Sequence, residues 1–437
     1  MNSRKHVISV LLALVLAPLS LAAQNIDATS GYSPYSMFGI GDVPNYGSVV
    51  SGTMGGIYSA VRDNRTINWM NPAAITCRDT LSFMLDFGAN INSKFISDGK
   101  NSGAGNSVNV RNFAFTTPIW GKSALVLGIA PYSTVGYKFL NTVDDPAISA
   151  IAGDVYNNQY GTGDIYQLFF GAAMDCFKRV SIGAQMIYFF GYQDRHSDMV
   201  FNSDSRYKSV YSGRKYKVNG FSGRFGIQYN QPIKKIGGVV NVGVTYQMGT
   251  SLGGEVSRYA YAKRNNVIDT LLPLPGEKVD TRLPIASQKT IGVSYRHKDK
   301  WMVGFDYLRE NWSQIKYEES VCPTGLDYQP SIASSFKLGF EYTPNRSDIR
   351  YYMKRVTYRA GAYYNKSYVT LGGNDVNGFG FTFGMSFPIF RYYNAINVGL
   401  DVGQRGTTKG GMAVERYVNF MVSVNLHDIW FVKYRYD

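Results

Sequence analysis

The side chains that could carry out chemistry are few and widely separated along the chain. Three histidines, His196, His297 and His427, follow the N-terminal region, and only His196 has close acidic neighbours, Asp194 and Asp198. Hydrolysis needs a nucleophile, a base and a group that orients the base in one place. The sequence also contains no zinc-ligand spacing and no phosphate-binding glycine loop. We therefore expect a protein that is not an enzyme and that binds no cofactor.

Cysteine is scarce, with three residues, Cys77, Cys176 and Cys322. None has CxxC or metal-ligand spacing, so no metal site is expected. Two interpretations stay open for the thiols. They are free and buried, or Cys77 and Cys176 form a disulfide, because the topology inferred below places both at the same end of the fold.

Period-2 alternation of apolar and polar side chains identifies the elements that must position these residues. It is clearest in 240–249, 379–387 and 396–403. Most of the alternating segments run for about 9–11 residues, the length that a tilted strand needs to cross a bilayer. Fourteen segments carry the pattern: 81–90, 107–117, 123–131, 164–174, 180–192, 216–230, 237–250, 289–298, 300–310, 334–343, 356–366, 378–387, 395–403 and 416–426.

The connections between these segments alternate in length. The connections 91–106, 132–163, 193–215 and 251–288 are long, whereas those after the even-numbered segments are short, except for 344–355. Short periplasmic turns and long external loops are typical of outer-membrane barrels. The sequence therefore predicts an all-β fold, a transmembrane antiparallel β-barrel of fourteen strands over 81–426. Residues 427–437 are a C-terminal periplasmic tail or the end of the last strand.

The N-terminus indicates export. Residues 1–23 combine the basic Arg4 and Lys5, an apolar stretch and a small-residue cleavage site at Leu21-Ala22-Ala23, which is the pattern of a secretory signal peptide. An even number of strands then leaves both ends of the barrel in the periplasm. We expect an integral protein of the bacterial outer membrane with a periplasmic N-terminus.

Composition agrees with a membrane barrel. Only 17% of the residues are charged and 15% are aromatic, whereas soluble domains carry roughly 25% charged residues. This composition excludes a disulfide-stapled miniprotein, a disordered tail protein and a coiled coil. The net charge is +14, and basic pairs such as Lys178-Arg179 and Lys234-Lys235 fall in predicted turns. We expect these cations to face lipid headgroups or lipopolysaccharide rather than nucleic acid.

Residues 24–80 precede the first predicted strand and lack clean alternation. They are rich in Gly, Ser and Asn but also carry apolar side chains at Met54, Ile57, Trp69 and Met70. A disordered leader gains nothing from such side chains. We expect this segment to lie in the lumen as a hatch, with a disordered periplasmic leader as the alternative.

Three short motifs in this segment resemble the FadL/TodX family of outer-membrane transporters: Met54-Gly55-Gly56, Arg62-Asp63-Asn64 and Asn71-Pro72-Ala73. The resemblance implies an N-terminal hatch that plugs a fourteen-stranded barrel, and release of hydrophobic compounds through a kink in its wall. It places Asn71, Pro72 and Ala73 in the hatch and makes Gly55 and Gly56 a tight hatch turn. Ala74 stands where the family usually has glycine. Residues 403–408 and 430–433 resemble a subgroup common in Bacteroidota.

The inferred lumen face is polar, and this polarity bears on the choice between two functions. Its polar members are Asp86, Gln185, Arg224, Asp306, Lys337, Glu341 and Asp401. The family resemblance implies passive, porin-like uptake of a hydrophobic, fatty-acid-like molecule, yet such a conduit should be lined by apolar side chains. If the charges pair across the lumen, the protein is instead a scaffold in an outer-membrane machine. Such a scaffold would be like BamF in barrel assembly or a barrel partner of type IX secretion. The loops 132–163 and 251–288 would then dock another barrel and surface lipoproteins.

Overall fold

The computed structural model describes residues 31–44, 47–79, 82–143, 146–201, 206–233, 235, 237–264, 267–272, 278–317, 327–389 and 394–429. The predicted signal peptide, Cys322 and residues 430–437 of the predicted tail lie outside these ranges.

Strands make up most of the described chain. They are β1 (Ser82–Ser97), β2 (Ser102–Pro118), β3 (Ser123–Thr142), β4 (Val155–Phe177), β5 (Val180–Phe201), β6 (Ser209–Ile233), β7 (Gly238–Gln247), β8 (Thr250–Arg264), β9 (Val267–Leu272), β10 (Lys278–Ile285), β11 (Gln288–His297), β12 (Trp301–Asn311), β13 (Tyr328–Pro330), β14 (Ile332–Tyr342), β15 (Thr357–Leu371), β16 (Asn374–Pro388), β17 (Ala395–Arg405) and β18 (Val414–Ile429). The short helices are η1 (Pro34–Met37), α2 (Val49–Gly52), η2 (Pro72–Thr76), α3 (Pro146–Ala152), η5 (Tyr352–Lys354) and η6 (Lys409–Gly411).

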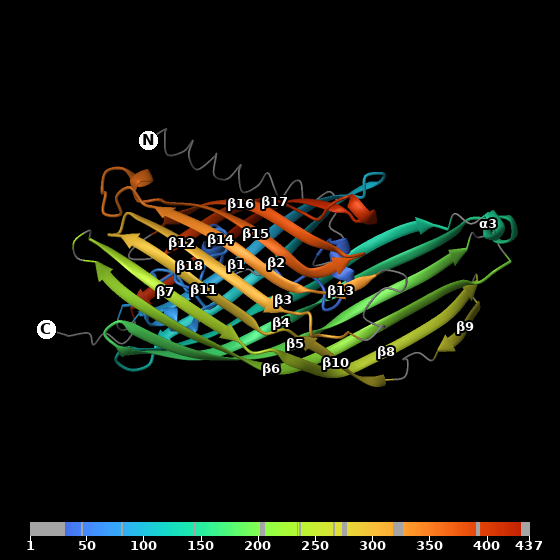
Figure 1. Ribbon diagram of the computed structural model, residues 1–437, viewed down its shortest axis with the longest axis horizontal. Helices are drawn as coiled ribbons and strands as arrows, with labels where there is room; N and C mark the ends of the chain where they lie inside the picture. The colour runs from blue at the N-terminus through green and yellow to red at the C-terminus, as the bar shows by residue number, and fades with distance from the viewer. Residues whose placement is uncertain are drawn as a thin grey trace.

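The strands form one closed antiparallel barrel with fourteen positions in its wall (Figure 1). Closure comes from β1, which pairs with β18 along its whole length, from Ser82 opposite Ile429 to Ser97 opposite Val414. The eighteen strands reduce to fourteen positions because β8 continues the position of β7, β9 and β10 continue that of β11, and β13 continues that of β14. The predicted fourteen-stranded barrel is confirmed.

Alternation along each strand sorts the side chains onto two faces of the wall. On β7, Val242, Val244 and Tyr246 are exposed, whereas the intervening Thr245 and Gln247 are buried. The same pattern puts apolar side chains on the outside and polar ones in the interior around the barrel. A lipid-facing apolar band over a polar interior is the reverse of a soluble β-sandwich, and it marks a barrel that spans a membrane.

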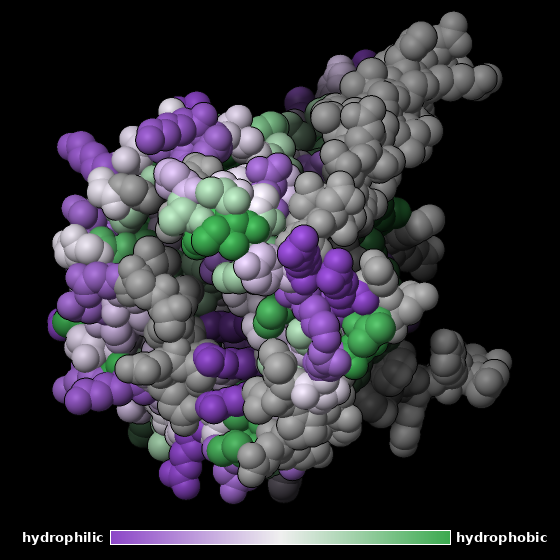
Figure 2. All heavy atoms as spheres, turned by 90° about the vertical axis from the view of Figure 1, so that its right-hand side faces the viewer, coloured by the Kyte–Doolittle hydropathy of each residue, from purple (hydrophilic) through white to green (hydrophobic). Residues whose placement is uncertain are grey.

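We call the rim where β1 begins and β18 ends the near rim, and the opposite one the far rim. At the far rim the predicted loops 132–163, 193–215 and 251–288 are wrong in detail, because most of their residues extend β3–β6 or form β8–β10. These extensions project beyond the rest of the wall (Figure 1). The apolar alternation that identifies a strand ends where the lipid ends, but backbone pairing continues beyond it. Hydrophilic side chains surround this rim (Figure 2).

Within the described residues, every helix is too short or too polar to cross a bilayer. The same residues contain no cluster of histidine, cysteine and carboxylate side chains that could hold a metal ion.

Candidate functional site

The interior of the barrel is occupied by the N-terminal segment, which we define as residues 31–79. It lies inside the ring of strands (Figure 1), and its largest apolar side chains, among them Ile57, Tyr58 and Trp69, are almost fully buried. Trp69 stacks on Phe169 of β4, with ring centroids 4.8 Å apart. The segment therefore shares its apolar core with the inner face of the wall.

Glycines on the inner wall let the backbone of the segment come close. A Cβ at Gly243 of β7 would overlap the carbonyl of Ser59, and one at Gly361 of β15 would overlap the backbone nitrogen of Gly55. Further inward-facing glycines lie against the segment: Gly183 against the Pro72 backbone, Gly226 against the Asn71 side chain, and Gly304 and Gly339 against the Ile57 side chain. Because glycine has no side chain, these positions form a surface on which the segment can dock closely.

The residues expected to form a hatch turn adopt tight local geometry. Gly55 and Gly56 have φ values of +66° and +81°, which side-chain-bearing residues rarely adopt. The Gly55 N–H donates to Thr382 of β16 at 2.8 Å. Asn71 caps η2 by accepting from the Ala73 N–H at 3.0 Å, and its amide donates to the Ser59 carbonyl at 2.6 Å. Pro72 and Ala73 follow as the buried first turn of η2.

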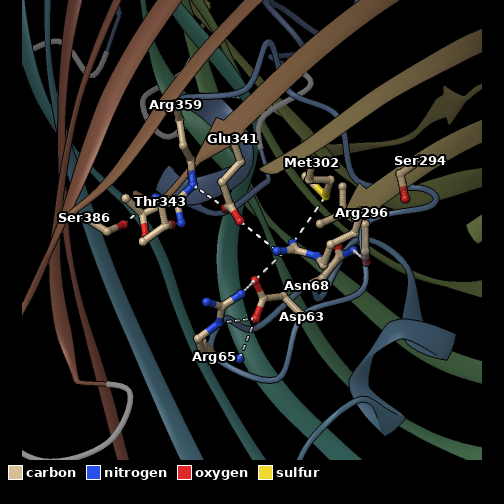
Figure 3. A network of polar contacts seen from close by, with 12 residues as sticks. Asp63, Arg65, Asn68, Ser294, Arg296, Met302, Glu341, Thr343, Arg359 and Ser386 are labelled. Atoms are coloured by element: carbon tan, nitrogen blue, oxygen red, sulfur yellow. Dashed lines mark hydrogen bonds and ion pairs between the residues drawn. The ribbon is translucent and has the colours of Figure 1, made fainter. Parts of the chain in front are cut away.

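A buried ion network joins the segment to the wall near the near rim (Figure 3). Asp63 of the segment pairs with its neighbour Arg65 at 2.5 Å and with Arg296 of β11 at 3.2 Å. Arg296 also contacts Glu341 of β14 at 2.9 Å, and Glu341 pairs with Arg359 of β15 at 2.9 Å. Burial alone would raise the pKa of Asp63, but Arg65 and Arg296 outweigh it and hold the pKa well below its usual range.

A second ion cluster joins the segment to the wall near the far rim. Arg405 of β17 contacts Asp42 at 2.7 Å and Glu415 of β18 at 2.9 Å, and Lys94 of β1 lies 3.6 Å from Asp42. Ser33 of the segment donates to Glu415. Burial opposes ionisation of Asp42, but Arg405 and Lys94 lower its pKa to about 2. The segment is thus held by buried charges near both ends of the barrel.

The polar residues expected to face the lumen are all buried, but they do not form one network. Two of them hydrogen-bond to the segment, and a third is joined to it through Arg296. Asp306 accepts from the N–H groups of Tyr58 and Ser59 at 2.7 and 2.8 Å, Lys337 donates to the Gly56 carbonyl at 3.4 Å, and Glu341 belongs to the near-rim network.

The other expected lumen residues mainly contact neighbours in the wall. Arg224 donates to Gln167, Gln185 and Gln247. Asp86 accepts from Asn112 at 2.7 Å and Asp401 from Tyr363 at 2.7 Å. These hydrogen bonds stabilise the wall and do not form a polar channel along the barrel axis.

Of the two interpretations left open for the thiols, the structure has free cysteines rather than a disulfide, because Cys77 and Cys176 are both free. Asp175 of β4 faces the interior, where it pairs with Arg62 at 3.4 Å. Its neighbour Cys176 is exposed, as alternation along the strand requires. Cys77 is on the inner side of the wall. The two thiols therefore lie on opposite faces, although both are at the near rim.

The histidines lie on three separate strands. His196 of β5 contacts Asp194 at 3.1 Å and stacks on Tyr160, whereas His297 at the end of β11 stacks on Trp301. His427 lies on β18. The three side chains take part in separate contacts, and the ion networks inside the barrel contain none of them.

The two cavities inside the barrel between the segment and the wall are small and are lined in part by charged side chains. A cavity of about 130 Å³ is lined by charged side chains that include Arg111, Lys337 and Arg405. A second, of about 90 Å³, lies beside Tyr32 and Asn109.

Near the far rim the wall has a seam between β2 and β3. These strands pair only from Phe113 opposite Ile129 to Pro118 opposite Ala124, whereas β3 continues to pair with β4 as far as Thr142. The N-terminal segment occupies the gap: the Ser33 N–H donates to the Gly136 carbonyl at 2.7 Å. A cavity of about 860 Å³ lies at the far-rim end of this seam.

Sequence reasoning missed most residues that fix the segment, among them Asp42, Arg296, Arg405, Glu415 and the inward-facing glycines. The glycines did leave a signal, because Gly243, Gly384 and Gly399 occupy positions on the polar side of alternating strands. Small residues at such positions allow another backbone to approach closely.

These features define an integral outer-membrane β-barrel whose interior is packed with its own N-terminal segment. A family model described as BamG matches residues 4–437, so the chain belongs to the BamG family. No protein of curated function matches the chain.

Solved structures with the same fold are outer-membrane channels. The toluene transporter TbuX of Ralstonia pickettii is 17% identical, with a TM-score of 0.57 over 87% of this chain and 98% of TbuX. The toluene transporter TodX of Pseudomonas putida is 13% identical, with a TM-score of 0.56 over 88% of this chain and 98% of TodX. A FadL homologue of Pseudomonas aeruginosa is 12% identical, with a TM-score of 0.55 over 89% and 98%. At these identities the likeness shows the FadL-type fold alone.

Proposed function

We propose that this protein is a non-transporting barrel subunit of an outer-membrane machine of the barrel-assembly kind. The observation that carries the proposal is the packing of residues 31–79 against the inner wall by two buried ion clusters. In this proposal the segment is a permanent hatch, and the barrel serves as a structural platform. The N-terminus and the near rim face the periplasm, and the far rim faces outward.

The interior chemistry supports a structural role. A conduit for hydrophobic molecules needs an apolar lining with few polar groups. Here the cavity of about 130 Å³ is lined in part by arginine, lysine and carboxylate side chains, and moving the segment would separate buried ion pairs. Breaking one buried pair costs about 3–5 kcal/mol, so routine opening for each transported molecule is costly.

The family and the far rim support membership in a larger assembly. The name BamG belongs to the same series as BamF, the barrel-assembly partner considered from the sequence. The extensions of β3–β6 and β8 project beyond the wall at the far rim (Figure 1). In the proposal these strands, rather than flexible loops, present the surface on which another barrel or a surface lipoprotein docks.

The composition of the native complex tests the proposal. The protein, tagged at its own chromosomal locus, would be purified from outer membranes in mild detergent and its companions identified by mass spectrometry. We expect another barrel and lipoproteins in stoichiometric amounts. A lone barrel that carries a lipid-like or hydrocarbon ligand would contradict the proposal.

Uptake of a hydrophobic small molecule is the second candidate, and the seam between β2 and β3 favours it. The cavity of about 860 Å³ at the seam is lined in part by Ile96, Phe139 and Leu140. The same purification separates the two functions, because uptake predicts a bound hydrophobic molecule and no stoichiometric partner.

A further inference from the structure

Two cations face each other on the outside of the wall without an acidic partner. Lys289 of β11 lies directly opposite Arg309 of β12. Both are exposed, whereas their neighbours Gln288, Thr290 and Glu310 are buried on the inner face. Like charges directly opposite each other destabilise an antiparallel pair, so this arrangement requires a compensating interaction.

Within the described residues, the surrounding wall supplies no anion. The outward-facing residue opposite Lys289 on β7 is Tyr246, and the one opposite Arg309 on β14 is Ser334. The acidic side chains of β12, Asp306 and Glu310, are buried on the inner face. Among the described residues, the ion pairs of the protein involve neither Lys289 nor Arg309. Lys366 on β15 differs, because it pairs with Asp375 of β16 at 2.5 Å.

The two cations lie at one end of an apolar stripe. Towards the near rim, the outward-facing residues on the same two strands include Ile291 and Val293 on β11 and Phe305 and Val303 on β12, exposed by 38–53%. Tyr246 lies beside the cations, with the Lys289 ammonium 5.9 Å from its ring centroid. Aromatic side chains next to an apolar band mark the level of the lipid headgroups in membrane barrels. The cations are therefore at headgroup level, directly above a surface for acyl chains.

We propose that Lys289 and Arg309 together bind the phosphate of an anionic lipid, whose acyl chains lie along the apolar stripe of β11 and β12. Arginine binds phosphate through two parallel N–H donors, and lysine adds a point charge. One phosphate between the two groups removes their repulsion and satisfies both. The site is independent of the function of the interior, so it stands whether the barrel is a scaffold or a channel.

Native mass spectrometry of the full-length mature barrel in a nonionic detergent tests the site. The probes are dioleoyl phosphatidylglycerol and dioleoyl phosphatidylcholine, which share acyl chains but differ in net charge. We expect the wild type to retain the anionic lipid preferentially, and Lys289→Gln/Arg309→Gln to lose roughly tenfold or more in affinity for it. The matched control is Lys298→Gln/Lys300→Gln, which removes two exposed cations at the near rim and should leave retention unchanged.

Three results would overturn the proposal. They are equal retention by the wild type and the Lys289→Gln/Arg309→Gln variant, an equal loss in the near-rim control, and displacement of the lipid by an equal concentration of inorganic phosphate.

A second measurement shows whether the variants are correctly folded. Lys289→Arg/Arg309→Lys keeps both charges and should retain the lipid, and in lipid-free detergent the neutral variant should unfold at a higher temperature than the wild type. A lower unfolding temperature would contradict the unpaired repulsion on which the site rests.

Discussion

Gly243→Val is expected to release the middle of the N-terminal segment from the barrel wall. A Cβ at this position overlaps the backbone carbonyl of Ser59. Ser59 cannot move aside easily, because its hydroxyl donates to the Gly243 carbonyl at 2.7 Å and its N–H to Asp306 at 2.8 Å. Overpacking a well-packed interior costs about 1–3 kcal/mol, and more where the backbone must shift. Hydrogen–deuterium exchange should show lost protection in residues 47–79 with the wall strands still protected.

The matched control is Gly253→Val on β8, where a Cβ meets nothing within 4 Å. Valine suits an exposed strand position, so this variant should behave as the wild type. If both variants keep full protection of residues 47–79, the inner-wall glycines are not a docking surface.

Arg296→Gln is expected to destabilise the fold by breaking the ion network near the near rim. The change leaves Asp63 and Glu341 buried without the guanidinium that joins them. Breaking a buried ion pair costs about 3–5 kcal/mol, and the remaining contacts of Arg65 and Arg359 keep the loss towards the lower figure. Equilibrium unfolding by urea in detergent measures it. The ion pair Lys354–Asp348 at the same rim supplies the control, because Lys354 is half exposed and Lys354→Gln should leave the unfolding free energy nearly unchanged.

The pH dependence of this loss follows from the lowered pKa of Asp63. A carboxyl group with a pKa lower in the folded than in the unfolded state adds stability above its unfolded value of about 3.9. That contribution disappears as the pH falls through the lower, folded value. The difference between Arg296→Gln and the wild type should therefore be full at neutral pH and shrink only in strong acid. A loss that is the same at all pH values would show that the charge of Asp63 is not involved.

The wall of the barrel is predictable because lipid imposes a simple rule on it. Every second side chain must be apolar, and 240–249 and 379–387 obey this rule so strictly that position and face can both be derived. Beyond the lipid the rule ends, which is why the strand extensions in 132–163 and 251–288 were expected to be loops. Pairing there depends on backbone hydrogen bonds, which any sequence without proline can form.

The contacts of the interior are less predictable, because their partners are far apart in the chain. Nothing in the sequence near Asp63 indicates that it forms an ion pair with Arg296, 233 residues later. Alternation predicts that Asp306, Lys337 and Glu341 face the interior. It does not predict which of them contacts the segment. For the two cysteines, position along the barrel axis was predicted correctly, but the face of the wall was not considered. Both lie at the near rim, and Cys176 faces outward because of its place in the alternation of β4. A predicted contact between two residues of a barrel must therefore agree with the face on which each residue lies as well as with its position along the barrel axis.

Conductance in planar bilayers tests the central claim, a barrel packed with its own N-terminal segment, most directly. We expect the purified wild type to insert without stable conductance steps, whereas Gly243→Val or deletion of residues 31–70 should produce the steps of an open pore. Steady conductance by the wild type, at a level that Gly243→Val does not raise, would show that the N-terminal segment does not close the barrel.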